Sequence, residues 1–362
     1  MAVKAASGLG KKAIFFTLSS VLIVSLFLLY YSTREDLSIK EKAEVGESRV
    51  AAVNNFVENV ENIYLPRAVY TSTNKAISVM TEYMVANGVY TNMSVNFPQV
   101  LMNGTLCNLA IDPSCTANVT LDDMSDYRLG LWLAKLTNVS REEMNIKAEF
   151  NISRITINQS DPWSLNVTAL IDYNISSPGV VTIIGRNVLI STAVGIEGFT
   201  DPLIAIETGG MVRRMINRSI IDLETEKGSA VVAKLVAEKT YIYQNRTGPS
   251  FLMRFEKNLN ASKCCGIESL ITEDILDTDG DNIPNPEFEQ GYRSYADFQF
   301  WMDDPAILCM RDEINYDNDL YNVTPAVSTE LFPFKLDRIH MDTIYGVPRT
   351  SQNDIKVDCS LS

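Results

Sequence analysis

The sequence predicts an α+β protein in which a long N-terminal helix carries a head rich in antiparallel β-structure. Three patterns predict this fold class: an uncharged apolar stretch at residues 13–31, apolar residues at helical spacing up to about residue 88, and alternating apolar and polar residues beyond about residue 145. Residues 263–362 show neither period and contain four of the six cysteines. We therefore expect an irregular, acidic C-terminal subdomain that disulfides hold in place.

The first expected element is a transmembrane helix over residues 13–31. This stretch contains no charge, Pro or Gly, and at 1.5 Å per residue it spans roughly 28 Å, about the thickness of a bilayer core. Lysines precede it and an acidic pair follows it, so the positive-inside rule places residues 1–12 in the cytoplasm as a basic leader. The sequence thus predicts a single-pass protein of the cell membrane, with the lipid bilayer as a partner and an extracellular ectodomain. A cleaved secretory signal is the alternative.

Residues 32–88 are expected to form an amphipathic helical stalk or hairpin. Apolar side chains recur there in steps of three and four, which is the spacing of a heptad seam, at Val50, Val53, Val57, Val60 and Tyr64. Pro66 interrupts this pattern, and a second helical pattern ends near Gly88. The helix is therefore predicted to bend or turn back at Pro66. The seam packs either on the protein's own head or on sister subunits, and the sequence leaves both alternatives open.

Residues 89–262 are predicted to be an α+β ectodomain built around an antiparallel sheet. From Leu165 to Ile175 every odd position is apolar and most even positions are polar, which is typical of a half-buried strand. The same reasoning predicts further strands from Ile146, at Val180–Ile184 and at Val188–Val194, and helices at 208–221 and 229–243.

Asparagine-linked glycosylation is predicted by an excess of Asn-x-Ser/Thr sequons. Twelve of the chain's twenty-eight asparagines stand in a sequon, whereas ordinary Ser and Thr usage gives about one in eight. All twelve lie beyond residue 31, where a glycosyltransferase outside the cell membrane reaches them. The predicted carriers of N-linked glycans are Asn92, Asn103, Asn118, Asn138, Asn151, Asn158, Asn166, Asn174, Asn217, Asn245, Asn260 and Asn322.

Disulfides are expected, because an even number of cysteines lies in a region predicted to be exported. The six are Cys107, Cys115, Cys264, Cys265, Cys309 and Cys359. The first two enclose a short turn, so we expect them to pair. The middle two are neighbours, which rarely bond to each other, so we expect each to pair separately with one of the last two.

Composition excludes several classes of function. A net charge of −14 argues against nucleic acid as a partner. His340 is the only histidine, so a Ser-His-Asp arrangement or a histidine metal centre has a single candidate, and we expect His340 to be a surface or ion-paired side chain. No catalytic motif is present, and no carboxylate pair stands out from the many acidic residues. We therefore expect a noncatalytic protein and not an enzyme.

A calcium site is predicted in the segment from Asp277 to Asn285. Oxygen ligands at alternating positions can surround one hard cation, and Gly280 lets the chain curl around it. The segment DTDGDNIPN resembles the calcium loops of thrombospondin type 3 repeats. The resemblance implies structural Ca²⁺ with these ligands: the side chains of Asp277, Asp279, Asp281 and Asn285, and the carbonyl of Ile283.

The N-terminus resembles that of archaeal type IV pilin-like proteins. Two lysines and Ala13 precede the apolar stretch, and an amphipathic helix and a β-rich head follow it. The resemblance covers the chain only up to about Leu65. It implies that a prepilin-type peptidase cuts between Ala13 and Ile14, and that the freed helices bundle into the core of an extracellular filament.

We therefore expect a structural cell-surface glycoprotein, a pilin-like subunit of a filament or surface assembly that self-associates through its N-terminal helix. The alternative is a solitary membrane-anchored adhesin or receptor, and an anchored extracellular enzyme is less favoured. A filament subunit should bury the seam between copies. A solitary receptor should bury it within the chain and expose a pocket.

Overall fold

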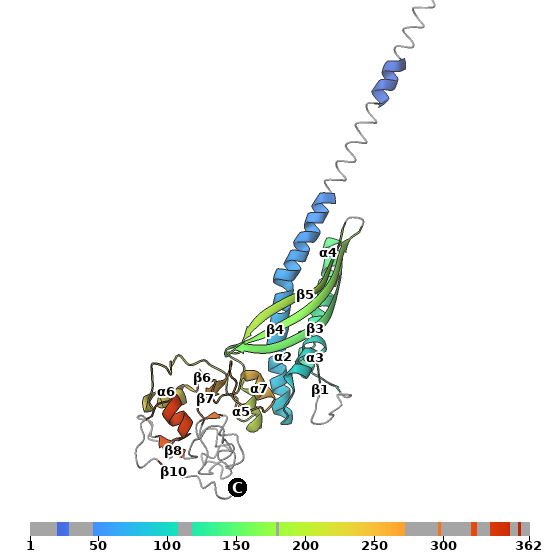
Figure 1. The fold of residues 1–362 in the computed structure, drawn as a ribbon. Helices are drawn as coiled ribbons and strands as arrows, with labels where there is room; N and C mark the ends of the chain where they lie inside the picture. Colours follow the sequence, from blue (N-terminus) through green and yellow to red (C-terminus); the bar gives the residue numbers. More distant parts are fainter. Residues whose placement is uncertain are drawn as a thin grey trace, which may run out of the picture.

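The computed structural model describes residues 20–28, 46–107, 118–178, 181–271, 296–297, 320–323, 334–347 and 354–355. These residues form helices and antiparallel sheets arranged as a helical rod that runs into a two-part head (Figure 1). The predicted mixture of helices and antiparallel strands is thus confirmed.

The rod is one continuous helix rather than a hairpin. Residues 46–59 are helical and continue through a π-helical turn, η1 (Val60–Tyr64), into α2 (Leu65–Asn87). Pro66 has no amide hydrogen to donate, which in an uninterrupted α-helix leaves a carbonyl without its partner. The π-turn lies immediately before it, and the Leu65 amide bonds five residues back to the carbonyl of Val60. The prediction that the chain turns back at Pro66 is therefore wrong, whereas a bend at this residue stays a prediction.

One face of α2 is buried along its whole length. Its buried positions recur every three or four residues, for example Val69, Ala76, Met80 and Met84, all at 0% exposure, so this stripe faces the head. The helix ends where the sequence predicts: Gly88 takes a left-handed conformation with φ of 61°, and its amide caps the last turn.

A group of short elements covers the end of the rod. In chain order they are α3 (Met93–Asn103), β1 (Thr105–Cys107), β2 (Asn118–Thr120), a 3-10 turn η2 (Asp122–Met124) and α4 (Leu129–Met144). The Asn92 side chain accepts a hydrogen bond from the Val95 amide and so starts α3. The Asn96 side chain accepts one from the Cys107 amide, at 2.9 Å, and so ties β1 to this helix.

The main sheet is a meander of three antiparallel strands. Its strands are β3 (Lys147–Asp161), β4 (Ser164–Ser177) and β5 (Val181–Gly195), in that order. The predicted alternation in β4 is confirmed, because Leu165, Val167, Ala169, Ile171 and Ile175 are all at 0% exposure. The two strands predicted at residues 180–184 and 188–194 are one strand, with a register shift opposite Ile171–Tyr173.

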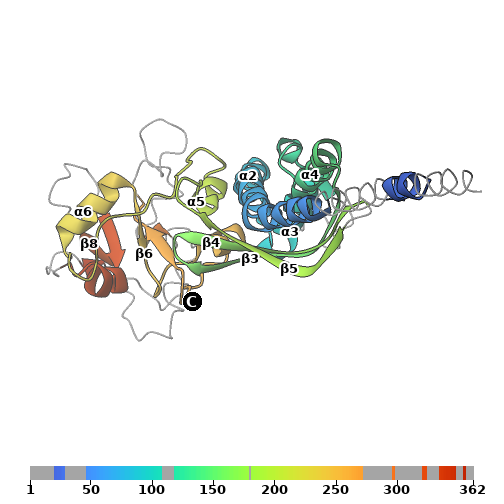
Figure 2. The ribbon, with the colours of Figure 1, turned by 90° about the horizontal axis from the view of Figure 1, so that it is seen from above.

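In the part of the chain that the structure describes, helices α2, α3 and α4 cover one face of this sheet. Viewed from above, α2, α3 and α4 lie on the same side of β3, β4 and β5 (Figure 2). Side chains from these helices and from the inner sheet face form one continuous hydrophobic cluster. The outer face carries polar residues of β4 together with a few exposed apolar ones, such as Ile184 and Leu189.

The second part of the head follows the sheet in the chain. Its elements are α5 (Pro202–Glu207), α6 (Ser229–Glu238), β6 (Tyr241–Tyr243), α7 (Phe251–Phe255), β7 (Ile267–Ser269), β8 (Leu320–Val323), β9 (Phe334–Asp337), π-helical η4 (Ile339–Ile344) and β10 (Asp354–Ile355). A separate hydrophobic cluster here joins residues from both sides of residue 263, such as Val232 and Leu336.

The helix predicted at residues 208–221 is wrong. Gly209 and Gly210 take positive φ angles, and the segment then runs extended, with bridges from Met215 to Thr200 and from Arg218 to Tyr241. The helix predicted at 229–243 is shorter, because Lys239 takes a left-handed conformation and strand β6 follows it.

No helix in the described part of the chain is long and apolar enough to cross a membrane. Within the apolar stretch the structure describes a helix at residues 20–28 only. This finding contradicts the predicted transmembrane helix at 13–31, on which the expected single-pass topology, cytoplasmic N-terminus and cell-membrane location rest; residues 13–19 and 29–31 lie outside those described. The basic leader 1–12 and the cleavage point between Ala13 and Ile14 lie outside the described residues.

Candidate functional site

The helix at residues 20–28 presents apolar side chains on every side. Seven of its nine residues are large and apolar, and each is between 55% and 67% exposed: Val21, Leu22, Ile23, Val24, Leu26, Phe27 and Leu28. The hydroxyl of Ser25 donates to its own helix, to the carbonyl of Val21 at 2.8 Å, so even this polar group is satisfied locally. Such a surface is unfavourable in water unless something covers it.

The heptad seam, in contrast, is covered by the protein's own head. Val53 and Val60 are 1% and 2% exposed, and Val57 and Tyr64 pack against the same hydrophobic cluster. Glu61 lies beside the seam and accepts a hydrogen bond from the Tyr173 hydroxyl at 2.5 Å. Burial, followed by the Glu61 carboxylate, raises the pKa of Tyr173 to about 12, so this contact between rod and sheet keeps its proton.

An apolar cavity of about 420 Å³ opens beside the π-turn. Ile63, Tyr64 and Ala68 from the rod line it together with Trp132 from α4. The Tyr64 hydroxyl donates to the Trp132 carbonyl at 3.2 Å, which fixes the cavity wall. The indole nitrogen of Trp132 is buried without a hydrogen-bond partner. The cavity therefore has mostly apolar walls, as small-molecule sites commonly do.

The second part of the head contains a buried ionic network centred on Arg254 of α7. Its Nη1 donates to Asp201 Oδ2 at 2.7 Å, and its Nη2 donates to Asp297 Oδ2 at 2.8 Å. The same Asp201 oxygen accepts the hydroxyl of Tyr241 at 2.7 Å. Asp201 also begins α5, because its other oxygen accepts the Leu203 amide. Arg254, Asp201 and Asp297 are all fully buried.

A second buried cluster lies around Glu268 of β7. One Glu268 oxygen is 2.9 Å from His340 Nε2 and accepts the Thr247 hydroxyl at 2.8 Å, while the other accepts the Tyr345 hydroxyl at 3.2 Å. His340 Nδ1 in turn contacts the Asp337 carboxylate. His340 is thus ion-paired, as one of the two expected alternatives has it, and it is buried rather than on the surface.

The charges of these groups follow from their surroundings. Burial opposes the charged imidazolium of His340, but Asp337 and Glu268 more than offset it and raise its pKa to about 10. Burial raises the pKa of Asp297 to about 6, although Arg254 opposes the shift. Burial also raises the pKa of Tyr241 and Tyr345 well above the ordinary value. At neutral pH His340 is therefore a cationic imidazolium, whose Nε2 donates to Glu268 and whose Nδ1 donates to Asp337.

Full burial limits what this network can do chemically. The side chains of Arg254, Asp201, Glu268 and His340 have no exposed surface, so no substrate reaches them in this conformation. Buried ion pairs hold together the elements that carry them, because separating the partners leaves an unpaired buried charge. Here they join α5, α7, β7 and η4, so we interpret the network as the polar core of this part of the head.

Sequence reasoning missed this network apart from His340. A signal was present: Arg254 and Glu268 are single charges inside the short apolar segments FLMRF and GIESL, and a lone charge in an apolar segment needs a buried partner. The partners themselves lie far apart in the chain, so their pairing has no local signature.

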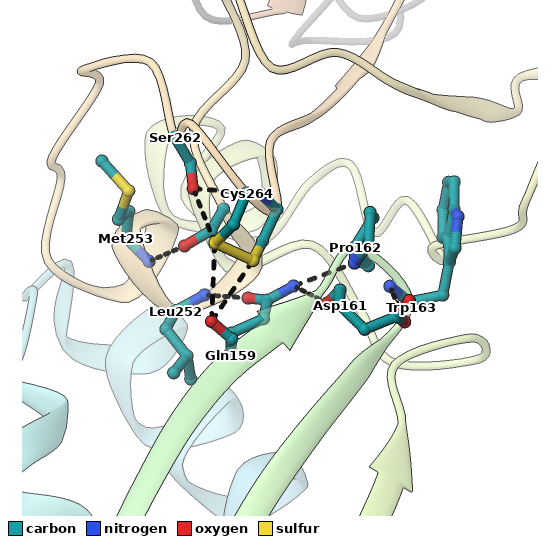
Figure 3. Close-up of a disulfide and its surroundings, with 10 residues drawn as sticks. Gln159, Asp161, Pro162, Trp163, Leu252, Met253, Ser262 and Cys264 are labelled. Atoms are coloured by element: carbon teal, nitrogen blue, oxygen red, sulfur yellow. Dashed lines mark hydrogen bonds between the residues drawn. A yellow bond between two sulfur atoms is a disulfide. The ribbon is translucent and has the colours of Figure 1, made fainter.

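The cysteines differ from the expected pairing. The structure joins Cys264 to Cys265 (Figure 3), so the expectation that each pairs separately with Cys309 or Cys359 is wrong. A turn at residues 263–265 places both sulfurs against the carbonyl of Gln159. Cys107 is also disulfide-bonded. Its expected partner Cys115, like Cys309 and Cys359, lies outside the described residues.

The predicted glycan carriers lie where a glycan fits. Asn166 is partly exposed, and the other described sequon side chains are exposed, namely Asn92, Asn103, Asn138, Asn151, Asn158, Asn174, Asn217, Asn245 and Asn260. Side-chain positions of Asn118 and Asn322 lie outside those described. Glycosylation stays a prediction, but each described position meets its steric requirement.

The predicted calcium loop, with ligands from Asp277 to Asn285, lies outside the described residues. Within the residues that are described, no group of three or more His, Cys, Asp or Glu side chains is arranged to hold a metal ion. The calcium site therefore stays a prediction from the sequence.

Comparison with known proteins adds no assignment. No protein-family model, no curated protein and no solved structure matches this chain.

Proposed function

We propose that this protein is a noncatalytic structural subunit that assembles with copies of itself through the helix at residues 20–28, in the manner of a pilin-like filament subunit. The observation that carries the proposal is the exposure of seven large apolar side chains on all sides of that helix. A helix that is apolar all round is stable only when it is surrounded. A single flat partner covers one side, whereas a bundle of identical helices covers all of them.

Burial of the seam within the chain is the outcome expected of a solitary receptor, and for a filament subunit it restricts where copies can meet. From Val53 onward the seam is buried on the protein's own head, so those residues are not available to sister subunits. The contact between copies therefore falls on residues 20–28. Sequon asparagines are exposed on both parts of the head. In such an assembly the helices would form the centre and the heads would remain in solvent, where glycans fit.

The test compares two equally exposed leucines. Leu26→Lys places a charge in the helix, and Leu189→Lys, the matched control, places one on the outer face of β5; the two side chains are 58% and 63% exposed. The mass in solution is measured by sedimentation velocity. We expect the unaltered protein and the control to be multimers and Leu26→Lys to be a monomer. A monomeric unaltered protein, or equal dissociation of both variants, contradicts the proposal.

A second candidate is a solitary binding protein that takes an apolar ligand beside Trp132. The intramolecular burial of the seam and the 420 Å³ cavity favour it. Ile63→Trp fills this cavity, so it should abolish the rise in fluorescence that an apolar probe such as anilinonaphthalene sulfonate shows on binding. A monomeric protein that loses probe binding in Ile63→Trp supports this candidate over the first, whereas unchanged binding removes it.

A further inference from the structure

The Cys264–Cys265 disulfide lies where the two parts of the head meet. It stands in the turn between α7 and β7, against the end of the hairpin formed by β3 and β4 (Figure 3). Cys264 is exposed, whereas Cys265 is completely buried. An external reagent therefore reaches one sulfur of the bond and not the other.

This bond does little as a cross-link. A disulfide stabilises a fold mainly by closing a loop in the unfolded chain, and the effect grows with the size of the loop. Cys264 and Cys265 are adjacent, so no loop lies between them. Its presence needs a reason other than stabilisation.

The surroundings of the sulfurs suit thiols better than a disulfide. The Gln159 carbonyl oxygen lies 3.2 Å from Cys265 Sγ and 3.6 Å from Cys264 Sγ, and the Ser262 hydroxyl lies 3.7 Å from Cys264 Sγ. A disulfide sulfur has no hydrogen, so this oxygen receives no hydrogen bond from the oxidised pair. A thiol at either position can donate to it.

The backbone around the pair is held independently of the sulfur bond. Gly266 accepts the amide of Gln244 at 2.8 Å, and Ile267 donates to Pro249 at 3.0 Å. A side chain on Gly266 would come within 2.2 Å of two backbone oxygens, so this segment is tightly packed. Opening the disulfide therefore leaves the turn in place, with the thiols beside their acceptor.

We propose that Cys264–Cys265 is a reversible thiol–disulfide exchange site whose co-substrate is a small external thiol. The thiolate attacks exposed Cys264 Sγ, which breaks the internal bond, forms a mixed disulfide and releases Cys265 as a thiolate. Cys265 takes a proton and donates it in a hydrogen bond to the Gln159 carbonyl. A second external thiolate then attacks the external sulfur and releases Cys264 as a thiol. In total, two external thiols are oxidised to one disulfide and the protein disulfide is reduced to two thiols.

The first experiment equilibrates the full-length protein with mixtures of reduced and oxidised glutathione, followed by alkylation and peptide mapping. We expect the peptide with residues 264 and 265 to acquire two alkyl groups, while the peptide with Cys107 remains disulfide-bonded. We also expect the far-ultraviolet circular dichroism to stay unchanged. Reduction only together with Cys107, loss of structure on reduction, or peptides that link Cys264 or Cys265 to another cysteine would each overturn the proposal.

A pair of single variants tests the direction of attack. Cys265→Ser leaves the exposed thiol and Cys264→Ser leaves the buried one, so the two proteins differ only in which sulfur remains. Native alkylation should be at least about tenfold faster in Cys265→Ser, because access controls thiol reactivity. Equal rates in the two folded variants would show that attack at Cys264 is not selective and would overturn the proposed order.

Discussion

At the scale of single residues, the charges in the second part of the head are the groups whose roles the structure defines most sharply. Arg254 is fully buried between two carboxylates, and its Nε has no hydrogen-bond partner among the described residues. Removing one member of such a cluster leaves the others as unpaired buried charges, which costs more than the pair contributes. Single substitutions here should therefore act on stability and not on a reaction.

Arg254→Met should lower the free energy of unfolding by roughly 3–5 kcal/mol, because Asp201 and Asp297 then lose their shared cation. The measurement is urea denaturation followed by circular dichroism. Arg213→Met is the control, since Arg213 pairs with Glu82 on the surface, where both side chains are about half exposed. The control should match the unaltered protein; an equal loss in both variants would contradict the role of burial.

His340 should make stability depend on pH in the alkaline range. Its folded pKa of about 10 lies above the unfolded value of about 6.5. The protonated state therefore stabilises the fold fully below pH 6.5, and this contribution is lost as pH rises towards 10. The Asp297 shift, with a folded pKa of about 6, acts at lower pH and does not overlap. Unfolding free energies measured from pH 7 to 10 should fall in the unaltered protein and flatten in His340→Gln; parallel curves would contradict this account.

At the scale of elements, the sequence predicted what local rules determine. The alternation in β4 and the end of α2 at Gly88 are confirmed because a sheet face and a left-handed cap each leave a direct pattern in the chain. The apolar spacing at 208–221 predicted a helix. Ile216 and Ile221 are indeed buried, but they lie in an extended segment and not on a helix face. Pro66 also suggested that the chain could turn back. It does not, because the π-turn before Pro66 accommodates the missing amide hydrogen, and no local sequence rule predicts this turn.

Gly88→Ala should destabilise the protein by about 1 kcal/mol, because φ of 61° disfavours any side chain. An added methyl group meets nothing within 4 Å there, so the cost is purely conformational. Gly46 is helical and equally open, which makes Gly46→Ala the control, and it should stabilise by up to about 1 kcal/mol. Thermal melts of the two variants should shift in opposite directions. A shift in the same direction would refute the conformational argument.

At the scale of the whole molecule, the sequence located the rod and the sheet but not how the chain closes on itself. The polar core joins Asp201, Glu268 and His340, which are distant in sequence, and the disulfide joins neighbours where distant pairing was expected. Both depend on tertiary placement. The transmembrane helix was predicted from length and hydropathy, and the described part of the chain contains none.

The calcium prediction also belongs to this scale, because a bound cation offsets part of the net charge of −14. Asp279→Ala should lower the melting temperature in the presence of Ca²⁺ but not with a chelator, since a ligand stabilises only the state that binds it. Differential scanning fluorimetry under both conditions measures this. An equal loss in calcium and in chelator would refute the site.

The π-turn at Val60–Tyr64 has a consequence for how this chain tolerates changes of length. It holds one residue more than an α-helical turn, and each residue added to an α-helix rotates everything before it by about 100° about the axis. Val53 and Phe56 face the head only with that rotation included. An insertion or deletion of one residue between Phe56 and α2 would turn these side chains away from the head. The extra residue at this turn therefore cannot be lost without rotating the buried side chains of the upper rod away from the head.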